Sequence, residues 1–187
     1  MENFISKLPL PAVDHLKVLH ELSLITKTVT KWEPENQIGL KHRPGCVDQW
    51  KDGIKSLYNS LEKKKTSLEH EYSIWNDQCP PYTRSILEDL SNAECVTWGR
   101  VRFMLARSKT GLSMHTDAEP RYHLVLSTNI NAIFGECFTD KDMRTIGYHI
   151  PADGHWYKVD TTREHFVYNG GWEPRIHLVA CPVTSYN

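Results

Sequence analysis

The sequence predicts a mainly β protein, a double-sheet jelly roll with helices from its amino-terminal half packed on the outside of one sheet. Two observations lead to this prediction. After Ala93 the chain becomes a series of short β-branched and aromatic segments separated by Gly, Pro, Asn and Asp, which is typical of antiparallel sheets. No helical pattern interrupts this series, which disfavours a parallel α/β sheet.

Before residue 93 the sequence favours helices. From about Val47 to His70, apolar residues recur mostly at three- and four-residue steps among charged ones, as on an amphipathic helix. Cys79-Pro80-Pro81 breaks the chain, and a short helix is expected over Thr83–Leu90, capped by Thr83 or a neighbour. The strands expected after residue 93 are Val96–Ala106, Tyr122–Ser127, Ala132–Phe138, Thr145–Ile150, Trp156–Val159, His165–Tyr168 and Arg175–Val183.

Length and composition indicate a single domain, in which residues 1–92 are a helix-rich supporting region and residues 93–187 form the jelly-roll core. The 187 residues are 40% hydrophobic and 24% charged with a net charge of -1, which gives no bulk attraction to nucleic acid or to a membrane surface. The amino terminus lacks the pattern of a secretory signal, and no apolar stretch is long enough to cross a bilayer, so a cytoplasmic location is expected.

His115 and Asp117 are candidate metal ligands because they are two positions apart. In an extended segment such residues project from the same face, where one ion can meet both. A third ligand must come from elsewhere, and His165 begins a strand after a polar turn. Two imidazoles and one carboxylate on one face of an ion leave adjacent positions open, which suits iron(II) and O2 chemistry better than a closed zinc site.

Arg175 is the candidate anchor for an acidic co-substrate. Asn169-Gly170-Gly171 is a turn signal, and a hairpin centred on Gly170 would place His165 opposite Arg175, facing one cavity. A guanidinium presents a planar fork of donors that can bind a carboxylate bidentately. That arrangement fits 2-oxoglutarate, with one end on the metal and the other on the arginine.

A short repeat supports a shared pocket. Arg121-Tyr-His123-Leu-Val is echoed by Arg175-Ile-His177-Leu-Val, and in each copy the arginine and histidine share one strand face. Arginine and histidine side chains that point inward from both segments form two inward rows, which predict an acidic ligand in the cavity. His149, His155 and His177 compete with His165 for the third ligand position, but none of them pairs with Arg175 at the hairpin.

Five ordered motifs in roughly the carboxy-terminal half resemble the aspartyl/asparaginyl β-hydroxylase family of iron(II)- and 2-oxoglutarate-dependent dioxygenases. They are His115-Thr-Asp117, Arg121-Tyr-His123-Leu, Trp156 with Asp160, His165-Phe-Val-Tyr-Asn169 and Arg175-Ile-His177-Leu-Val179. The resemblance implies a cupin-like double-stranded β-helix, iron ligation by His115 and His165, and 2-oxoglutarate recognition by Arg175. It also implies that Arg121 and His123 lie in the pocket, near the co-substrate or a substrate carboxylate.

The chain departs from the animal peptide hydroxylases of this family, which have glycine where it has Asp117. Asp117 completes a two-histidine, one-carboxylate site, as in related bacterial amino-acid hydroxylases. We therefore expect an Fe(II)- and 2-oxoglutarate-dependent dioxygenase that uses O2 to hydroxylate an amino-acid side chain, free or in a peptide or protein, of the aspartyl/asparaginyl or prolyl type. Residues 1–90 match no motif of the family.

Plainer interpretations remain open at this stage. The cluster of His115, Asp117 and His165 could be a buried polar group or a non-catalytic metal site, and Arg175 could pair with a carboxylate such as Asp160. Arg121 and His123 could form an ordinary ion pair and a core histidine. At the level of the whole protein, the alternatives are a jelly-roll protein that binds an acidic ligand without redox chemistry, and a cupin-type metal-dependent isomerase or hydrolase.

Overall fold

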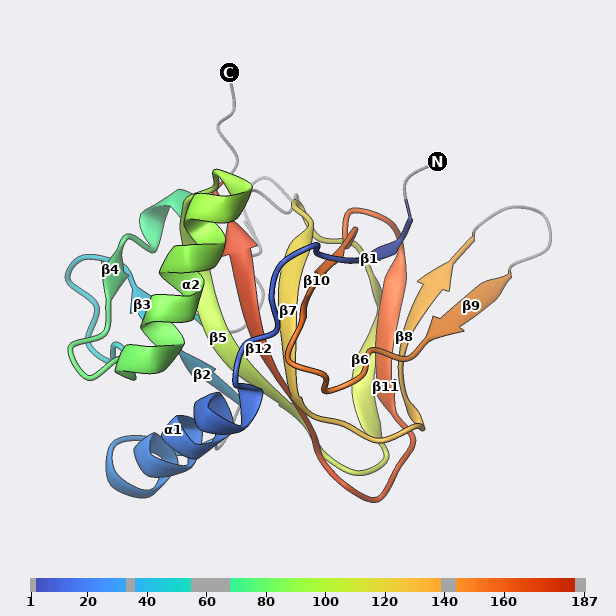
Figure 1. Ribbon diagram of the computed structural model, residues 1–187, viewed down its shortest axis with the longest axis horizontal. Coiled ribbons are helices and arrows are strands. Elements are labelled where there is room, and N and C mark those ends of the chain that lie inside the picture. Colours follow the sequence, from blue (N-terminus) through green and yellow to red (C-terminus); the bar gives the residue numbers. More distant parts are fainter. Residues whose placement is uncertain (1–2, 33–35, 55–67, 139–143, 184–187) are drawn as a thin grey trace.

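Two antiparallel sheets packed face to face form the body of the molecule (Figure 1). The computed structural model describes residues 3–32, 36–54, 68–138 and 144–183. The larger sheet has six strands in the order β1-β10-β7-β12-β5-β2, and the smaller sheet has four in the order β6-β11-β8-β9. This arrangement confirms the predicted jelly roll. No helix among the described residues is both long enough and apolar enough to span a membrane.

The strands divide between the sheets as follows. The larger sheet contains β1 (Ile5–Lys7), β2 (Gln37–Gly39), β5 (Trp98–Ala106), β7 (Arg121–Ser127), β10 (Trp156–Val159) and β12 (Arg175–Pro182). The smaller sheet contains β6 (Thr110–His115), β8 (Ala132–Cys137), β9 (Thr145–Tyr148) and β11 (His165–Asn169). A separate ribbon pairs β3 (Lys41–His42) with β4 (Ile74–Trp75).

All seven strands predicted after residue 93 are present, with ends that differ by at most two residues. One further strand there, β6, was not predicted. It lies at the edge of the smaller sheet, where it pairs only with β11, and most of its side chains are exposed. Because an exposed edge strand needs no alternation of apolar and polar residues, its sequence carries little signal.

The predicted helix from Val47 to His70 is wrong where the structure describes it. Residues 47–54 form turns, and Glu69–Glu71 is a single 3-10 turn, η1, while residues 55–67 lie outside the described residues. The Asp48 side chain accepts a hydrogen bond from the backbone N–H of Trp50 (2.9 Å), which favours a turn over a helix. The carbonyl of Trp50 accepts from the N–H of Gly39 (2.8 Å), which ties this segment to β2.

Helix α1 (His15–Thr28) was not predicted, although its sequence carries the usual signals. The Asp14 side chain caps its amino terminus by accepting from the N–H of Lys17 (2.9 Å). Val18, Leu22 and Ile25 are buried, at steps of four and three residues that place them on one helix face.

Helix α2 (Pro81–Glu94) is the predicted second helix, extended by two residues at its start and four at its end. Proline at its first position suits a helix start, where no N–H partner is needed. The predicted side-chain cap by Thr83 or a neighbour is wrong, because the N-cap residue is Pro80 and makes no side-chain hydrogen bond. Instead, the carboxylate of Glu21, on α1, accepts from the N–H groups of Tyr82 (3.0 Å) and Thr83 (2.8 Å). Negative charge at a helix amino terminus is stabilising, so this contact also joins the two helices.

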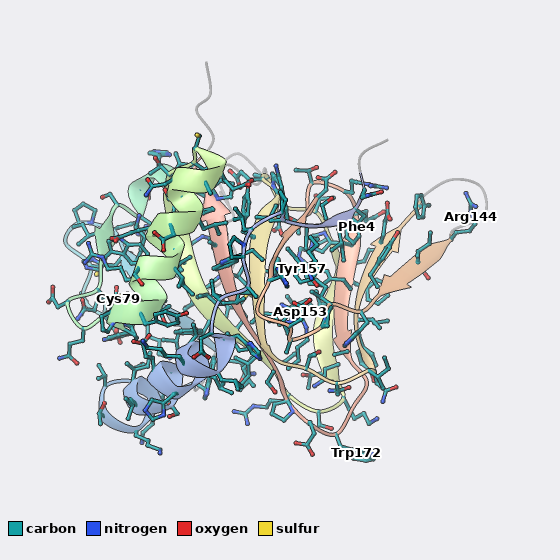
Figure 2. All side chains as sticks on the ribbon, in the orientation of Figure 1. Phe4, Cys79, Arg144, Asp153, Tyr157 and Trp172 are labelled. Atoms are coloured by element: carbon teal, nitrogen blue, oxygen red, sulfur yellow. The ribbon has the colours of Figure 1, made fainter. Side chains whose placement is uncertain are left out.

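Two apolar cores result, one on each face of the larger sheet. The first lies between this sheet and both helices, as predicted, and includes Leu22, Leu87, Phe103, Leu124 and Leu178. Figure 1 shows α1 and α2 on the side away from the smaller sheet. The second core lies between the two sheets and consists of Phe4, Val125, Phe134, Ile150, Tyr157, Val159 and Val167 (Phe4 and Tyr157 are labelled in Figure 2).

Candidate active site

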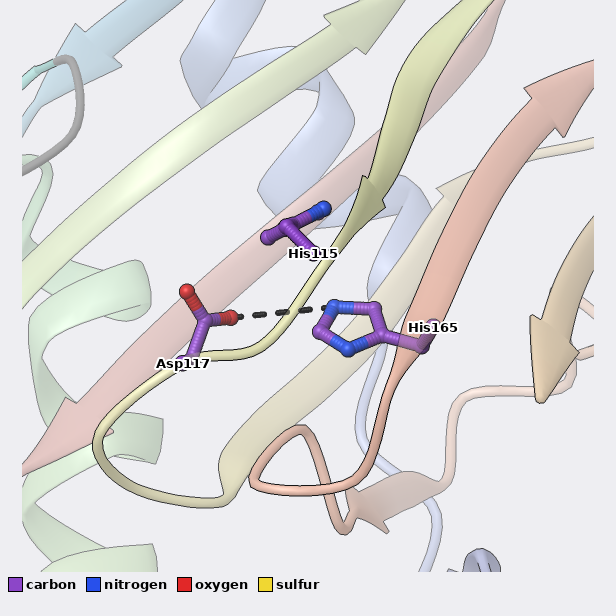
Figure 3. Close-up of side chains that lie close together, drawn as sticks. All are labelled: His115, Asp117 and His165. Carbon is purple, nitrogen blue, oxygen red and sulfur yellow. Dashed lines mark ion pairs between the residues drawn. The ribbon is translucent and has the colours of Figure 1, made fainter. Parts of the chain in front are cut away.

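His115 and His165 face each other across two adjacent strands of the smaller sheet. His115 ends β6, His165 begins β11, and the two are partners in the antiparallel register. Asp117 follows two residues after β6, and its N–H donates to the carbonyl of Thr161 (2.8 Å), in the loop that enters β11. The ligand atoms of these three side chains all lie within 4.8 Å of one another (Figure 3). The structure thus brings together the three residues predicted to share a metal.

A β-bulge in β6 sets the direction of His115. Between the pairs His165–His115 and Val167–Leu112, β11 advances by two residues and β6 by three, so β6 carries one extra residue. Residues three apart lie on opposite faces of a regular strand, and a bulge reverses this alternation. Leu112 and His115 consequently both line the cavity between the sheets.

Both histidines are held in the form that binds a metal. Nδ1 of His115 lies 2.6 Å from the carbonyl oxygen of Ser113, and Nδ1 of His165 lies 2.9 Å from that of Arg163. Because a carbonyl only accepts, each Nδ1 carries the proton and each Nε2 keeps its lone pair. Burial lowers the pKa of His165, which keeps its imidazole neutral near pH 7. Backbone acceptors of this kind orient histidine ligands in metal sites.

The two oxygens of Asp117 have different surroundings. Oδ1 lies 2.7 Å from Nη2 of Arg121 in a largely buried ion pair. Oδ2 lies 3.7 Å from Nε2 of His165 and is a buried atom with no hydrogen-bond partner. Such an atom is costly to bury, and a cation shared with the two imidazoles would satisfy it. The donor set fits iron(II) with open coordination positions.

Arg175 lies on β12, in the opposite sheet, and lines the same cavity as the three candidate ligands. Only 7% of the residue is exposed, and its guanidinium carbon lies 5.0 Å from the centre of the Phe134 ring. Nη2 lies 3.1 Å from Nδ1 of His177. Among the described residues no carboxylate pairs with Arg175, Asp160 included. Burial lowers the pKa of Arg175 to about 9, because nothing nearby compensates the buried charge.

The predicted hairpin between His165 and Arg175 is wrong. β11 pairs with β6 and β8, whereas β12 pairs with β5 and β7, so the two strands belong to different sheets. Residues 170–174 cross from one sheet to the other, and Trp172 lies at the tip of this crossing (Figure 2), 81% exposed. His165 and Arg175 still face one cavity because the sheets pack face to face, and not because the strands pair.

The repeated Arg-x-His motifs lie on neighbouring strands of the larger sheet. β7 and β12 are antiparallel partners, and Arg121, His123, Arg175 and His177 all line the cavity. Arg121 makes the ion pair with Asp117, so the plainer interpretation of Arg121 describes its contact in this structure. His123 is buried, and its Nδ1 lies 3.3 Å from Nδ1 of His177.

The remaining histidine candidates lie apart from the three ligands. His149 and His155 each place Nδ1 near a backbone carbonyl, of Ala132 (3.1 Å) and Leu10 (3.2 Å), and neither lines the cavity. His177 does line it, fully buried, as its place in an inward row with Arg175 predicted. Its alternation with Arg175 was the signal that it faces inward.

Among the other residues considered, Trp156 is a core residue, 2% exposed. Met104, on β5, lines the cavity, while Arg102 is buried nearby and donates to Oε1 of Gln37 (3.3 Å). A second cavity of about 150 Å³ adjoins the first and shares Met104 and Arg175 with it. Arg175 therefore borders both cavities.

Comparisons with known proteins show the family to which the chain is similar. Residues 16–181 match the model of the Aspartyl/Asparaginyl beta-hydroxylase family. The match begins near the amino terminus, so the expectation that the likeness covers only the carboxy-terminal half is wrong. A search of curated proteins gives no match.

Several solved structures share the fold at low sequence identity. AviO1 from Streptomyces viridochromogenes Tue57 is 14% identical with a TM-score of 0.56, and the match covers 97% of this chain and 90% of that one. A Pseudomonas putida prolyl-4-hydroxylase is 12% identical with a TM-score of 0.53, covering 96% and 91%.

Proposed function

Since the chain belongs to the aspartyl/asparaginyl β-hydroxylase family, we propose that it uses iron(II), 2-oxoglutarate and O2 to hydroxylate an amino-acid side chain. Membership of this family makes the chain a hydroxylase of the 2-oxoglutarate oxygenase class, as the sequence predicted. Our proposal adds the kind of substrate, an amino acid that is free or part of a peptide or protein, and the residues that serve each role.

The observation that carries the proposal is the buried guanidinium of Arg175 across the cavity from a possible metal site. A buried charge without a partner is strongly unfavourable, and proteins keep one where a ligand supplies the counter-charge. No described carboxylate fills this role at Arg175, and the cavity extends from its guanidinium to His115, Asp117 and His165. A small acid that reaches from Arg175 to the metal would supply a counter-charge to the guanidinium and ligand atoms to the metal.

The proposed roles follow from the contacts. His115, Asp117 and His165 would hold iron(II) through two Nε2 atoms and Oδ2. Iron(II), when bound, supplies the redox chemistry in which 2-oxoglutarate and O2 give succinate, carbon dioxide and one oxygen atom for the substrate.

Arg175 would bind the far carboxylate of 2-oxoglutarate and fix the direction of the acid. Apolar side chains complete the cavity wall, among them Leu112, Phe134 and Val167. They would keep water away from the reacting groups. The protein's own share of catalysis is therefore orientation and exclusion of water.

Substrate-stimulated release of succinate tests these roles. A panel of amino acids and peptides would first be screened for stimulated 2-oxoglutarate turnover, with mass spectrometry for a gain of one oxygen atom. His165→Ala should abolish the stimulated release because one of three ligands is lost. Arg175→Lys should retain metal and raise the KM for 2-oxoglutarate about tenfold or more, since a point charge cannot reproduce the planar fork.

A matched control is His155→Ala, which removes a half-buried histidine outside the cavity and should leave turnover unchanged. Wild-type turnover in both His165→Ala and Arg175→Lys, with the same dependence on 2-oxoglutarate, would show that these residues do not form the active site. Turnover of the acid without O2 consumption would instead favour a metal-dependent isomerase or hydrolase.

A further inference from the structure

A pair of buried histidines beside Arg175 has no part in the roles described so far. His177 is on β12, two residues after Arg175, and His123 is on the neighbouring strand β7. Their rings are 5.5 Å apart between centroids and nearly perpendicular, at 77°. Both side chains line the cavity, and the Nε2 atom of each is buried without a hydrogen-bond partner. Each ring therefore has one nitrogen that is satisfied and one that is not.

The contacts at Nδ1 of His177 decide which nitrogen of each ring carries the proton. Nη2 of Arg175 lies 3.1 Å from this atom, and Nδ1 of His123 lies 3.3 Å from it. A guanidinium only donates, so Nδ1 of His177 must be the acceptor. Nδ1 of His123, which faces the same lone pair, must then carry a proton. Any other placement of the protons on two neutral rings would set two N–H groups, or two lone pairs, against each other.

The two rings consequently present opposite groups at their free ends. A neutral imidazole has one N–H, so His177 carries it at Nε2 and His123 has a lone pair at Nε2. Burial, followed by the charge of Arg175, lowers the pKa of both histidines well below the usual value, which keeps the rings neutral. His177 therefore offers a donor and His123 an acceptor.

We propose that His177 is a second donor for the acidic co-substrate, with its Nε2–H binding the carboxylate that Arg175 grips. This inference rests on the proposed function and adds a residue to it. A carboxylate has lone pairs for more donors than one guanidinium face supplies, and a buried donor beside it gives a charge-assisted hydrogen bond.

His123 has a different part. The resemblance to the family placed it near the co-substrate, but a lone pair at Nε2 repels a carboxylate and cannot donate to one. We assign His123 as a positioning residue, which donates through Nδ1 and supports the tautomer of His177. Its own Nε2 would accept from a donor group, such as an N–H of a substrate or a water.

Nitrogen-15 spectra of histidine-labelled protein test the tautomers directly. The protein is loaded with Zn(II), a diamagnetic substitute, and the signals are assigned with His177→Gln and His123→Gln. We expect His177 to carry its proton at Nε2 and His123 at Nδ1, with both rings neutral at pH 6.5. A proton at Nδ1 of His177, or two charged rings, would overturn the assignment. This readout needs no turnover.

Anaerobic titration of the iron(II)-loaded protein tests the role of His177. Chelation of a 2-oxo acid by iron(II) gives a charge-transfer absorption band, which reports binding of 2-oxoglutarate and of 2-oxopentanoate, the same chain without the far carboxylate. His177→Phe should raise the Kd for 2-oxoglutarate roughly 10- to 100-fold, as expected for a lost hydrogen bond to a charged group. It should change the Kd for 2-oxopentanoate less than about threefold.

His177→Gln keeps an N–H donor and should lose less affinity than His177→Phe, and His155→Gln, outside the cavity, should lose none. Equal loss for both acids in His177→Phe, or no loss for either, would refute the proposal. The proposed function fails separately: wild-type protein that binds iron(II) but gives no band with 2-oxoglutarate would exclude it, while the spectra of the two histidines could still be read.

Discussion

Arg100 and Arg175, two of the buried arginines of the larger sheet, differ in whether a carboxylate of the protein pairs with them. Arg100, on β5, is 4% exposed, and both oxygens of Glu69 bind it: Oε1 accepts from Nε (2.8 Å) and Nη2 (2.5 Å), and Oε2 accepts from its backbone N–H (2.7 Å). Arg175, on β12, is 7% exposed and has no described carboxylate partner. One charge is neutralised within the protein and the other is not.

This difference separates structure from function. Glu69 belongs to η1 and binds both the side chain and the backbone N–H of Arg100 on β5. Arg175 instead faces a cavity that leads to the candidate metal ligands. The buried charge of Arg100 therefore stabilises the fold, whereas the lack of a described carboxylate at Arg175 indicates where an acidic ligand binds.

Removing the partner of Arg100 should have the largest effect on stability. Glu69→Gln leaves a buried guanidinium without its counter-charge, and we expect the free energy of unfolding to fall by about 3–5 kcal/mol. Chemical denaturation followed by circular dichroism measures this. The control is Glu88→Gln, which breaks the exposed ion pair with Arg84 and should cost less than about 0.5 kcal/mol. Equal effects of the two substitutions would mean that Arg100 needs no partner.

Removing Arg175 itself should affect binding far more than folding. In Arg175→Met the lost hydrogen bond to His177 is offset by relief from burying an unpaired charge, so the free energy of unfolding should stay within about 1 kcal/mol of wild type. Binding of 2-oxoglutarate should weaken by about 2–5 kcal/mol, as measured by calorimetry with Mn(II). A large loss of stability without a change in binding would make Arg175 a structural residue like Arg100.

The pH dependence of the free energy of unfolding should show a smaller effect of the ion pair between Glu69 and Arg100. Burial alone would raise the pKa of Glu69, but Arg100 holds it below the ordinary value of 4.5. Because the pKa of Glu69 is lower in the folded state than in the unfolded state, the ion pair stabilises the fold at pH values above the unfolded-state pKa. This contribution is lost as the pH falls through the folded-state pKa. Below about pH 4.5 the unfolding free energy of wild type should fall more steeply than that of Glu69→Gln.

The strands that form the core were predictable because their signal is local. β10 (Trp156–Val159) was predicted to the residue, since β-branched and aromatic side chains with turns on either side need no knowledge of partners. Pairing was not predictable in this way. The turn at Gly170 suggested a hairpin, but the strands on either side join different sheets, a choice that depends on the packing of the whole fold.

The candidate site shows the same division. The spacing of His115 and Asp117 and the motif order indicated three ligands, and the structure places them together. The ion pair between Asp117 and Arg121 was considered only as an unspecified alternative, because a sequence does not say which carboxylate an arginine meets. The inward position of His177 was present in the alternation of β12, yet its partners at Nδ1 required the register of β7 against β12.

Crystals of the protein grown without O2, with Mn(II) and 2-oxoglutarate, would show whether an acid joins the metal site to Arg175. We expect an ion bound by His115, Asp117 and His165, with one end of the acid on the ion and the far carboxylate on Arg175. An ion bound by other residues, or an acid that reaches the ion while Arg175 remains without a carboxylate, would rule out this arrangement.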